Sequence, residues 1–433
     1  MRLPNALLKF GPAIIIVSIV LGPGSVLSSS KVGCQYGYQF LWVIAAATLL
    51  MMGMSTLGTL VGVSVQATPC EEVARRFGRP ASVLVGVTLF LVVACFQASN
   101  NIAVLASLEG LTGSVADAPA RGSGSGVASV AILAAMNLLI VAALYGFKQT
   151  YRWLERFMGA LVLTMVVGFV INLVLAQPSI AGMLRGLIPS LPQGRGESLL
   201  PRLSDGEVVD PFWGVQALIA TTLSVAAAFF QPYLVREKKW TSQDARAGVG
   251  DALRGIALLG ATTAVVMATS AAALHGKLAP EALRSAGDVA RQLEPLFGEY
   301  AAALFSLGIF CAAFSSFLGN ALIGGVVLSD SLGWGASFDG RAPKLLTCLA
   351  LAAGMAAAMA STVTTFSVVQ LVVLAQALTV LGGPLLAFVL LWLATKLSGR
   401  GRLATIPFAL VVTLVSIGLA VRTAWRLYLQ SGL

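Results

Sequence analysis

Charged residues are scarce in this chain. Only 11% of its 433 residues are Asp, Glu, Lys or Arg, whereas 57% are hydrophobic. Roughly a quarter of the residues are charged in an ordinary soluble domain, so this balance excludes that class. We therefore expect a polytopic membrane protein.

Histidine, paired cysteines and enzyme motifs are missing as well. The only histidine is His275, and the five cysteines occur singly, without a CxxC pair. These counts exclude a histidine-based metal cluster within one chain and indicate structural thiols. The chain has no HExxH, P-loop, nucleophile elbow or paired intramembrane carboxylates. We therefore expect neither an enzyme nor a bound cofactor.

Acidic side chains are also absent from the middle of the apolar segments. The chain has 18 Asp and Glu residues, and none of them is expected deep within a span. A proton-coupled transporter usually carries its proton on an intramembrane Asp, Glu or His. This absence argues against proton coupling.

The long apolar segments dominate what is present. Eleven are long enough to cross a hydrocarbon core of about 30 Å. They lie at roughly 11–33, 38–66, 82–108, 127–147, 153–176, 211–235, 252–275, 299–328, 343–360, 366–397 and 404–429. We predict an all-α membrane protein in which residues 1–433 form one transmembrane transporter domain. The first segment lacks a small-residue cleavage site, so we expect it to remain in the mature protein.

The basic residues predict the orientation of the chain. With the N-terminus inside, 18 of the 28 Lys and Arg residues fall in the cytoplasmic loops. Positively charged loops stay in the cytoplasm, so the N-terminus is predicted inside and the C-terminus outside, in a bacterial-type cytoplasmic (inner) membrane. The basic residues are scattered over short loops, which favours contact with anionic lipids and argues against nucleic acid.

The first apolar segment is interrupted halfway by Gly22-Pro23-Gly24-Ser25. Proline removes a backbone donor, and glycine has poor helix propensity. The helix should therefore unwind here, which a membrane tolerates only inside protein or beside a cavity. A lone Gly-Pro-Gly can also mark a simple kink.

A second interruption is expected in the sixth segment, at Gln231-Pro232. The long loop at 177–210 would separate repeat one (11–176, spans 1–5) from repeat two (211–397, spans 6–10), with an extra span at 404–429. Five spans per repeat force the two halves into opposite orientations. Corresponding breaks in the two halves are a pointer to a transporter binding site.

Several patches of the chain resemble the NRAMP family of proton-coupled divalent-metal transporters. They are Gly11-Pro12, Gly22-Pro23-Gly24-Ser25, the run from Tyr36 to Trp42, the run from Glu71 to Gly78, and the run from Gln370 to Gln376. The resemblance implies an inverted five-plus-five repeat, as in amino-acid and sodium symporters, with discontinuous helices 1 and 6.

The site residues implied by the resemblance are only partly kept. An Asp and an Asn of the family's first-helix motif coordinate the metal, and Gly22 and Ser25 stand at their positions. In the sixth helix the family uses Ala-x-x-Met-Pro-His. Aligning the prolines places Ala228, Gln231 and Tyr233 at its carbonyl, methionine and histidine positions, and a shift by two residues places Phe229 at the methionine.

Further polar residues inside the spans are candidates for lining the same site. The resemblance points to Gln376, and Asn100 and Asn320 are possible additional lining residues. Amides and hydroxyls in spans also serve simply to bridge helices. Any bound metal would have to be held by this same set of candidate residues.

The expected function is an NRAMP-like secondary transporter that moves a cation, a divalent metal ion on family grounds, by alternating access. The site offers hydroxyl, amide and carbonyl oxygens in place of a carboxylate and a thioether. A hard cation that keeps its water, such as magnesium, is therefore favoured over manganese or iron. The alternatives are the same fold transporting a non-metal organic solute, or a transport-inactive sensor or scaffold. The expected partners are the transported ion or small solute and membrane lipids, and no oligomeric state is predicted.

Overall fold

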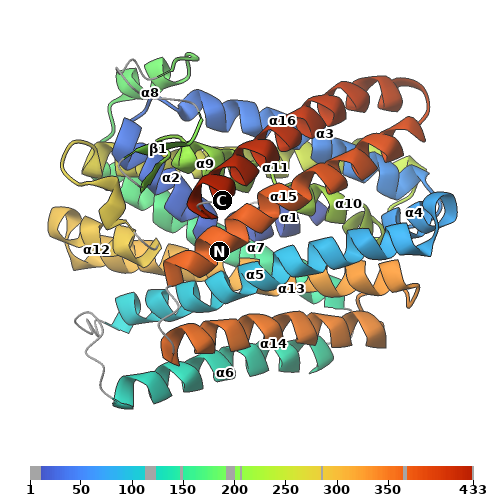
Figure 1. Ribbon diagram of the computed structural model, residues 1–433, viewed down its shortest axis with the longest axis horizontal. Helices are drawn as coiled ribbons and strands as arrows, with labels where there is room; N and C mark the ends of the chain where they lie inside the picture. Colours follow the sequence, from blue (N-terminus) through green and yellow to red (C-terminus); the bar gives the residue numbers. More distant parts are fainter. Residues whose placement is uncertain are drawn as a thin grey trace, which may run out of the picture.

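The computed structural model describes residues 11–112, 123–146, 150–191, 200–204, 207–283, 286–363 and 368–431. Almost all of them are helical (Figure 1). The first half contains α1 (Pro12–Val20), α2 (Pro23–Tyr36), α3 (Leu41–Ser64), α4 (Pro69–Phe77), α5 (Arg79–Thr112), α6 (Ser123–Gly146), α7 (Thr150–Ala176) and α8 (Ile180–Gly186). The second half contains α9 (Trp213–Thr222), α10 (Val225–Glu237), α11 (Ala245–Leu274), α12 (Ala286–Phe297), α13 (Glu299–Leu332), α14 (Arg341–Val363), α15 (Val368–Thr395) and α16 (Gly399–Ser431). Two short 3-10 helices, η2 (Ser242–Asp244) and η3 (Pro280–Ala282), precede α11 and α12.

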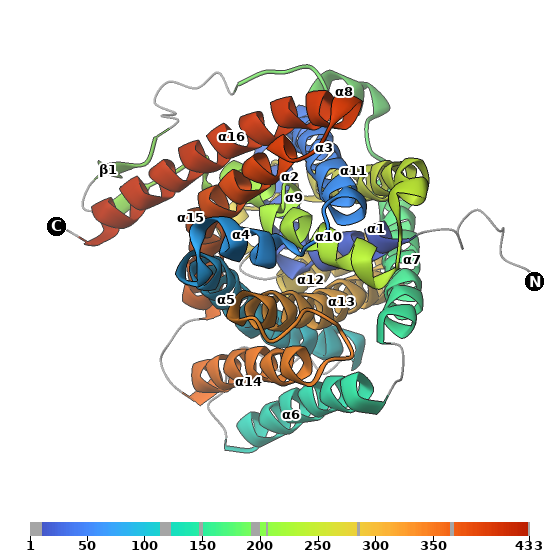
Figure 2. The same cartoon turned by 90° about the vertical axis from the view of Figure 1, so that its right-hand side faces the viewer.

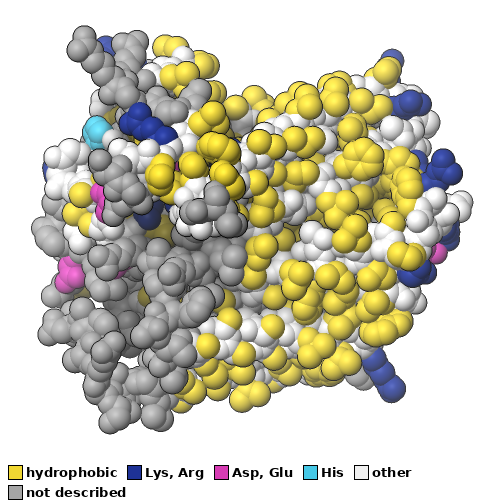
Figure 3. All heavy atoms as spheres, viewed as in Figure 1, with side chains coloured by type: hydrophobic (Ala, Val, Ile, Leu, Met, Phe, Trp, Pro, Cys, Tyr) yellow, Lys and Arg dark blue, Asp and Glu magenta, His cyan; other side chains and the backbone are white. Residues whose placement is uncertain are grey.

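The expected spans are present. Within the described residues, ten helical segments are long and apolar enough to cross a membrane, and the bent pair α1–α2 supplies an eleventh. Figure 3 shows a broad band of hydrophobic side chains across the middle of one face, with Lys and Arg gathered at the end where α4 lies. The prediction of an all-α polytopic membrane protein is confirmed.

The long loop predicted at 177–210 contains more structure than expected. It holds α8 and an antiparallel hairpin of β1 (Arg202–Ser204) and β2 (Glu207–Val209), in which Arg202 faces Val209. Ser179 caps α8 by accepting a hydrogen bond from the amide of Gly182 at 3.1 Å. The helices α8 and α12 and strand β1 lie at the end of the molecule opposite α4 (Figure 1).

Several spans of the first half pack on their counterparts in the second half. Helix α3 packs against α11, α5 against α13, and α6 against α14, so the second, third and fourth spans of the first half meet their counterparts in the second. The broken spans pair in the same manner, α1 with α10 and α2 with α9. This pairing is the arrangement expected of an inverted repeat with discontinuous helices 1 and 6.

The broken spans occupy the middle of the bundle. All nine residues of α1 are buried. In the end-on view of Figure 2, α1, α9 and α10 lie near the centre, and α6, α14 and α16 lie at the periphery. The interrupted backbone is therefore enclosed by protein, as interrupted backbone in a membrane must be.

Candidate functional site at two helix breaks

The first break lies where the sequence predicts it. Helix α1 ends at Val20, Gly22 is extended with ψ of 178°, and α2 begins at Pro23 after a bend of 57°. Proline is favoured at the first position of a helix, where its missing N–H is not needed. The same missing N–H deprives the carbonyl of Ile19 of its normal helical partner four residues on. The break therefore removes one helical hydrogen bond at the end of α1.

The second break is present, but its predicted position is wrong. Helix α10 runs without interruption through Gln231 and Pro232. The break instead separates α9, which ends at Thr222, from α10, whose N-cap is Ser224. The Ser224 hydroxyl accepts a hydrogen bond from the amide of Ala227 at 3.3 Å. A capping hydroxyl, rather than proline, marks where this span opens.

The two breaks lie at the same depth in the bundle, because α1 packs on α10 and α2 packs on α9. A direct contact joins the halves just beyond them. The hydroxyls of Ser28 in α2 and Thr221 in α9 are 3.2 Å apart. The last turn of α9 and the first turns of α2 therefore form one polar surface.

Two buried hydroxyls beside the breaks have no hydrogen-bond partner among the described residues. They are the Oγ of Ser25 in the first turn of α2 and the Oγ1 of Thr222 at the end of α9. Both side chains are buried, with relative exposures of 3% and 0%. A buried hydroxyl without a partner is unfavourable, so these two groups suit a ligand or ordered water.

Helix α13 forms a wall against the first break. Gly22 is so close to it that an added Cβ would lie 2.6 Å from the Oγ of Ser316. Asn320 donates to that same Oγ at 2.9 Å, and Ser315 donates to the carbonyl of Ser18 at 2.8 Å. The predicted lining residue Asn320 thus acts through Ser316, which touches the break directly.

The residues predicted on α10 lie away from the second break and contact other helices. Gln231 donates to the Oγ1 of Thr59 in α3 at 3.1 Å, and its Oε1 has no partner among the described residues. The carbonyl of Ala228 also faces α3, where it would lie 2.9 Å from a Cβ on Gly58. The ring of Phe229 is fully buried and tilted against that of Tyr233, 6.4 Å away.

Tyr233 is tied to the end of the bundle where α4 lies. Its hydroxyl donates to the Oδ2 of Asp330 in α13 at 2.7 Å and accepts from the amide of Cys70 at 3.3 Å. This geometry links α4, α10 and α13. It gives Tyr233 a bridging contact distant from the break.

The remaining predicted residues lie on α5 and α15. Asn100 donates to the Oε1 of Gln97 at 3.1 Å, and Gln97 donates to the carbonyl of Phe317 in α13 at 2.7 Å. This amide pair bridges two helices. Gln376 belongs to α15, and its side chain lies outside the described residues.

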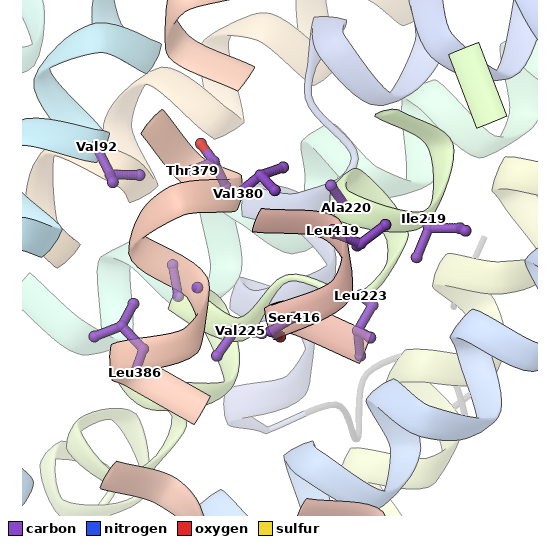
Figure 4. Close-up of a pocket in the computed structure, with 12 residues that line it drawn as sticks. Val92, Ile219, Ala220, Leu223, Val225, Thr379, Val380, Leu386, Ser416 and Leu419 are labelled. Atoms are coloured by element: carbon purple, nitrogen blue, oxygen red, sulfur yellow. The ribbon is translucent and has the colours of Figure 1, made fainter. Parts of the chain in front are cut away.

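An apolar cavity of about 30 Å³ adjoins the second break (Figure 4). Leu223 and Val225 line it from either side of the break, together with Val92 of α5, Thr379 of α15 and Leu419 of α16. That volume suffices for about one water molecule. The cavity has no room for an organic solute in this conformation.

Two buried carboxylates escaped the sequence prediction. Asp251 in α11 and Asp330 in α13 have relative exposures of 2% and 6%. Both lie just outside the predicted spans at 252–275 and 299–328. Helices α11 and α13 extend beyond these apolar segments and therefore include both residues. Asp251 accepts hydrogen bonds from the amides of Gly11 at 2.7 Å and Ala13 at 3.0 Å. It therefore caps α1 from a neighbouring helix.

Thr221, Thr222 and Ser224 also lie at the second break and were not predicted from the sequence. Their signal was present as a short polar run, Thr-Thr-Leu-Ser, inside an apolar segment. Serine and threonine at such a point favour a helix terminus. Pro232 lies eight residues after Ser224, and a proline is the more familiar sign of a helix break.

Comparisons with known proteins agree with this architecture. The sequence profile of the family described as "Natural resistance-associated macrophage protein-like" matches residues 13–428. A divalent metal cation transporter MntH of Deinococcus radiodurans is 27% identical over 327 residues, which cover 75% of this chain and 69% of that protein. An MntH of Chromohalobacter salexigens is 25% identical over 328 residues, which cover 74% of this chain and 69% of that protein.

Solved structures show the same fold. A mutant of the manganese transporter of Eremococcus coleocola superposes with a TM-score of 0.70 at 17% identity, covering 98% of this chain and 94% of that one. MhsT in complex with L-phenylalanine superposes with a TM-score of 0.59 at 16% identity, covering 96% and 98%. The profile match extends over nearly the entire chain and agrees with the first-break motif and the paired broken spans. The chain therefore belongs to the NRAMP family.

Proposed function

We propose that this protein is a secondary transporter that moves a divalent metal cation across the membrane by alternating access. Family membership and the two broken spans at one depth support the proposal. Two MntH relatives are named as divalent metal cation transporters. The distribution of basic residues supports an orientation with the N-terminus inside a bacterial-type cytoplasmic membrane.

The chemistry of the breaks carries the proposal on selectivity. The described groups there are the hydroxyls of Ser25, Thr221, Thr222 and Ser316 and the carbonyls at the end of α1. These are neutral, hard oxygen donors. Manganese and iron are better served by a site that adds a carboxylate and a thioether.

Full dehydration of a divalent cation without an anionic partner is prohibitive in a low-dielectric site. Magnesium gives up its water reluctantly and is usually bound through several water molecules. We therefore propose that the substrate is a hard, largely hydrated cation such as magnesium. The unpartnered hydroxyls of Ser25 and Thr222 would then contact the water shell.

Uptake into proteoliposomes tests this function. Magnesium and manganese are compared over a concentration series, each with and without an inward proton gradient, beside a panel of small organic solutes. Saturable magnesium uptake exceeding manganese uptake is expected. Saturable manganese uptake with acidification would contradict the proposed selectivity, and organic-solute uptake without metal flux would favour the alternative substrate class.

A further inference from the structure

A second, larger cavity lies between the start of α7 and the end of α10, at the end of the bundle where α4 lies. Its volume is about 530 Å³, which is room for a ligand headgroup and several water molecules. Seven of its eight lining residues are charged. It shares no residue with the two helix breaks or with the small apolar cavity beside the second break.

The three carboxylates of this cavity already have partners within the protein. Glu155 accepts a hydrogen bond from the Nζ of Lys238 at 2.6 Å. Glu237 accepts from a backbone amide at 2.9 Å. Asp339 accepts from the hydroxyl of Thr150 at 2.6 Å. Only one of the four cations of the cavity, Lys238, is therefore used to pair a carboxylate that lines it.

The other three cations are available to a ligand. Arg152 and Arg156 lie one turn apart at the start of α7, and Lys239 directly follows the end of α10. All three are exposed, and none of their side chains has a hydrogen bond or an ion pair within the described residues. Lys239 also has a φ of 61°, which residues other than glycine rarely adopt. Four cations against three carboxylates give the cavity an excess positive charge, which favours an anion.

A buried hydroxyl beside these cations also lacks a partner. Tyr151 lines the cavity, is 6% exposed, and has no hydrogen-bond partner for its Oη among the described residues. The Nζ of Lys238 lies 5.7 Å from the centre of its ring. A buried hydroxyl without a partner is unfavourable, and a ligand oxygen would supply the missing acceptor. Arginines, a lysine and a hydroxyl donor together suit a phosphate group.

The face of α7 that continues from the cavity is apolar and exposed. Leu163, Val167 and Val174 have relative exposures of 39%, 48% and 68%. They follow Arg156 by 7, 11 and 18 residues, so they lie on the same side of the helix as that arginine. Helix α7 lies at the edge of the bundle in the end-on view of Figure 2. An acyl chain can lie along this face while its headgroup occupies the cavity, whereas a free phosphate would make no contact with it.

We propose that this cavity binds the phosphate headgroup of an anionic phospholipid from the adjoining membrane leaflet. Arg152, Arg156 and Lys239 pair with the phosphate oxygens, and the hydroxyl of Tyr151 donates to one of them. In the predicted orientation this is the cytoplasmic leaflet, whose surface carries anionic lipids. The lipid joins α7 to α10 and so stabilises the conformation in which the ends of these helices meet. The site does not depend on which substrate the protein transports.

Thermal unfolding of the purified full-length protein in detergent tests the site. Phosphatidylglycerol is titrated, with phosphatidylcholine of the same acyl chains as the neutral lipid and inorganic phosphate as the soluble source of the same chemistry. A saturating rise in melting temperature is expected with phosphatidylglycerol alone, because a ligand of the folded state stabilises it. Arg152→Gln combined with Arg156→Gln should weaken the apparent affinity for phosphatidylglycerol roughly thirtyfold.

A matched control removes two other arginines from the same end of the bundle. Arg76 in α4 and Arg246 in α11 are exposed and do not line the cavity. Arg76→Gln combined with Arg246→Gln lowers the net charge equally and should weaken the affinity less than about threefold. Tyr151→Phe should weaken it about threefold. The melting temperature of Tyr151→Phe without lipid should stay unchanged, because the lost hydroxyl has no partner among the described residues.

Three results of the titration would overturn the proposal. One is equal affinity of the two double variants, which would reduce the effect to net charge. Another is an equal response to phosphatidylcholine. The third is a saturating rise with inorganic phosphate that phosphatidylglycerol does not exceed, which would assign the cavity to a free phosphate.

Native mass spectrometry of the unmodified protein gives a second measurement in case a double variant does not fold. Retention of phosphatidylglycerol in preference to phosphatidylcholine is expected, and equal retention of the two lipids would contradict the site. Neither measurement involves metal uptake, so failure of the proposed transport function would leave the lipid result standing, and the reverse also holds.

Discussion

The two broken spans open by different means. The α1–α2 break contains proline and two glycines, bends by 57° and faces α13 through Gly22. The α9–α10 break contains neither residue type and is bounded by Thr222 and the capping Ser224. The proline of the second span lies inside α10, one turn after the carbonyl of Ala228 that it leaves without an amide partner.

The difference shows that a helix-hostile residue breaks a helix of this fold at one position and is accommodated within a helix at another. At Gly22 they open the backbone. At Pro232 the helix continues because α3 packs closely against it, with Gly58 opposite Ala228 and Gly62 opposite Pro232. Small residues allow this close approach between helices, and the surrounding packing compensates for the lost hydrogen bond.

The strongest test of the first break restores the missing acid. In Gly22→Asp, the new Cβ would lie 2.6 Å from the Oγ of Ser316. Overpacking of about 1–3 kcal/mol and an unpaired buried charge should destabilise the protein, as measured by thermal unfolding. Gly22→Asp combined with Ser316→Gly relieves the clash. Only the double variant should show manganese binding by calorimetry, and equally tight binding by the single variant would contradict the close approach.

The half-helices α1 and α10 are capped at their N-termini by different kinds of residue. Helix α1 is capped by Asp251 of α11, whereas α10 is capped by its own Ser224. Asp251→Ala leaves two buried amides without an acceptor and should lower the free energy of unfolding by about 2 kcal/mol or more. Asp251→Asn keeps one acceptor oxygen, so its loss of free energy of unfolding should be roughly half of the loss in Asp251→Ala. Equal unfolding midpoints for the two variants would show that the cap contributes through charge alone.

The second break is tested by two alanine substitutions on one helix. Ser224→Ala removes the N-cap and should lower the free energy of unfolding by about 1 kcal/mol. Pro232→Ala adds an N–H opposite the carbonyl of Ala228 and should change the stability by less than about 0.5 kcal/mol. Chemical denaturation of both variants in the same detergent measures the difference. A larger loss in Pro232→Ala would place the functional discontinuity at the proline after all.

Much of the fold was predictable from the sequence because its determinants are local. Each span is a run of apolar residues, and the first break is a Gly-Pro-Gly that no continuous helix favours. The second break was misplaced because the stability of Pro232 within α10 depends on Gly58 and Gly62 of another helix. Such long-range compensation leaves no trace in the local sequence.

The candidate site was predictable only in part for the same reason. Gly22 and Ser25 lie beside the break where the motif places them. Ser316 was visible as a polar residue in an apolar segment, but its contact with Gly22 spans nearly 300 residues of chain. Asp251 and Asp330 stand at span ends, where an acid ordinarily faces water, and only the packing shows that they are buried.

The smallest expected effect is a change in the KM for uptake, and it compares Ser25, which lies beside the first break, with Gln231, which lies on α10 away from the second break. Ser25 lies in the first turn after the first break with its hydroxyl unpartnered among the described residues, whereas Gln231 contacts Thr59 of α3. Loss of one weak hydrogen bond to a hydrated ion in Ser25→Ala should raise the KM for magnesium uptake about threefold. Gln231→Ala should change it less than about twofold, because the side chain faces a neighbouring helix. If the order of the two effects is reversed in proteoliposome uptake, the substrate lies beside α3 and not between the breaks.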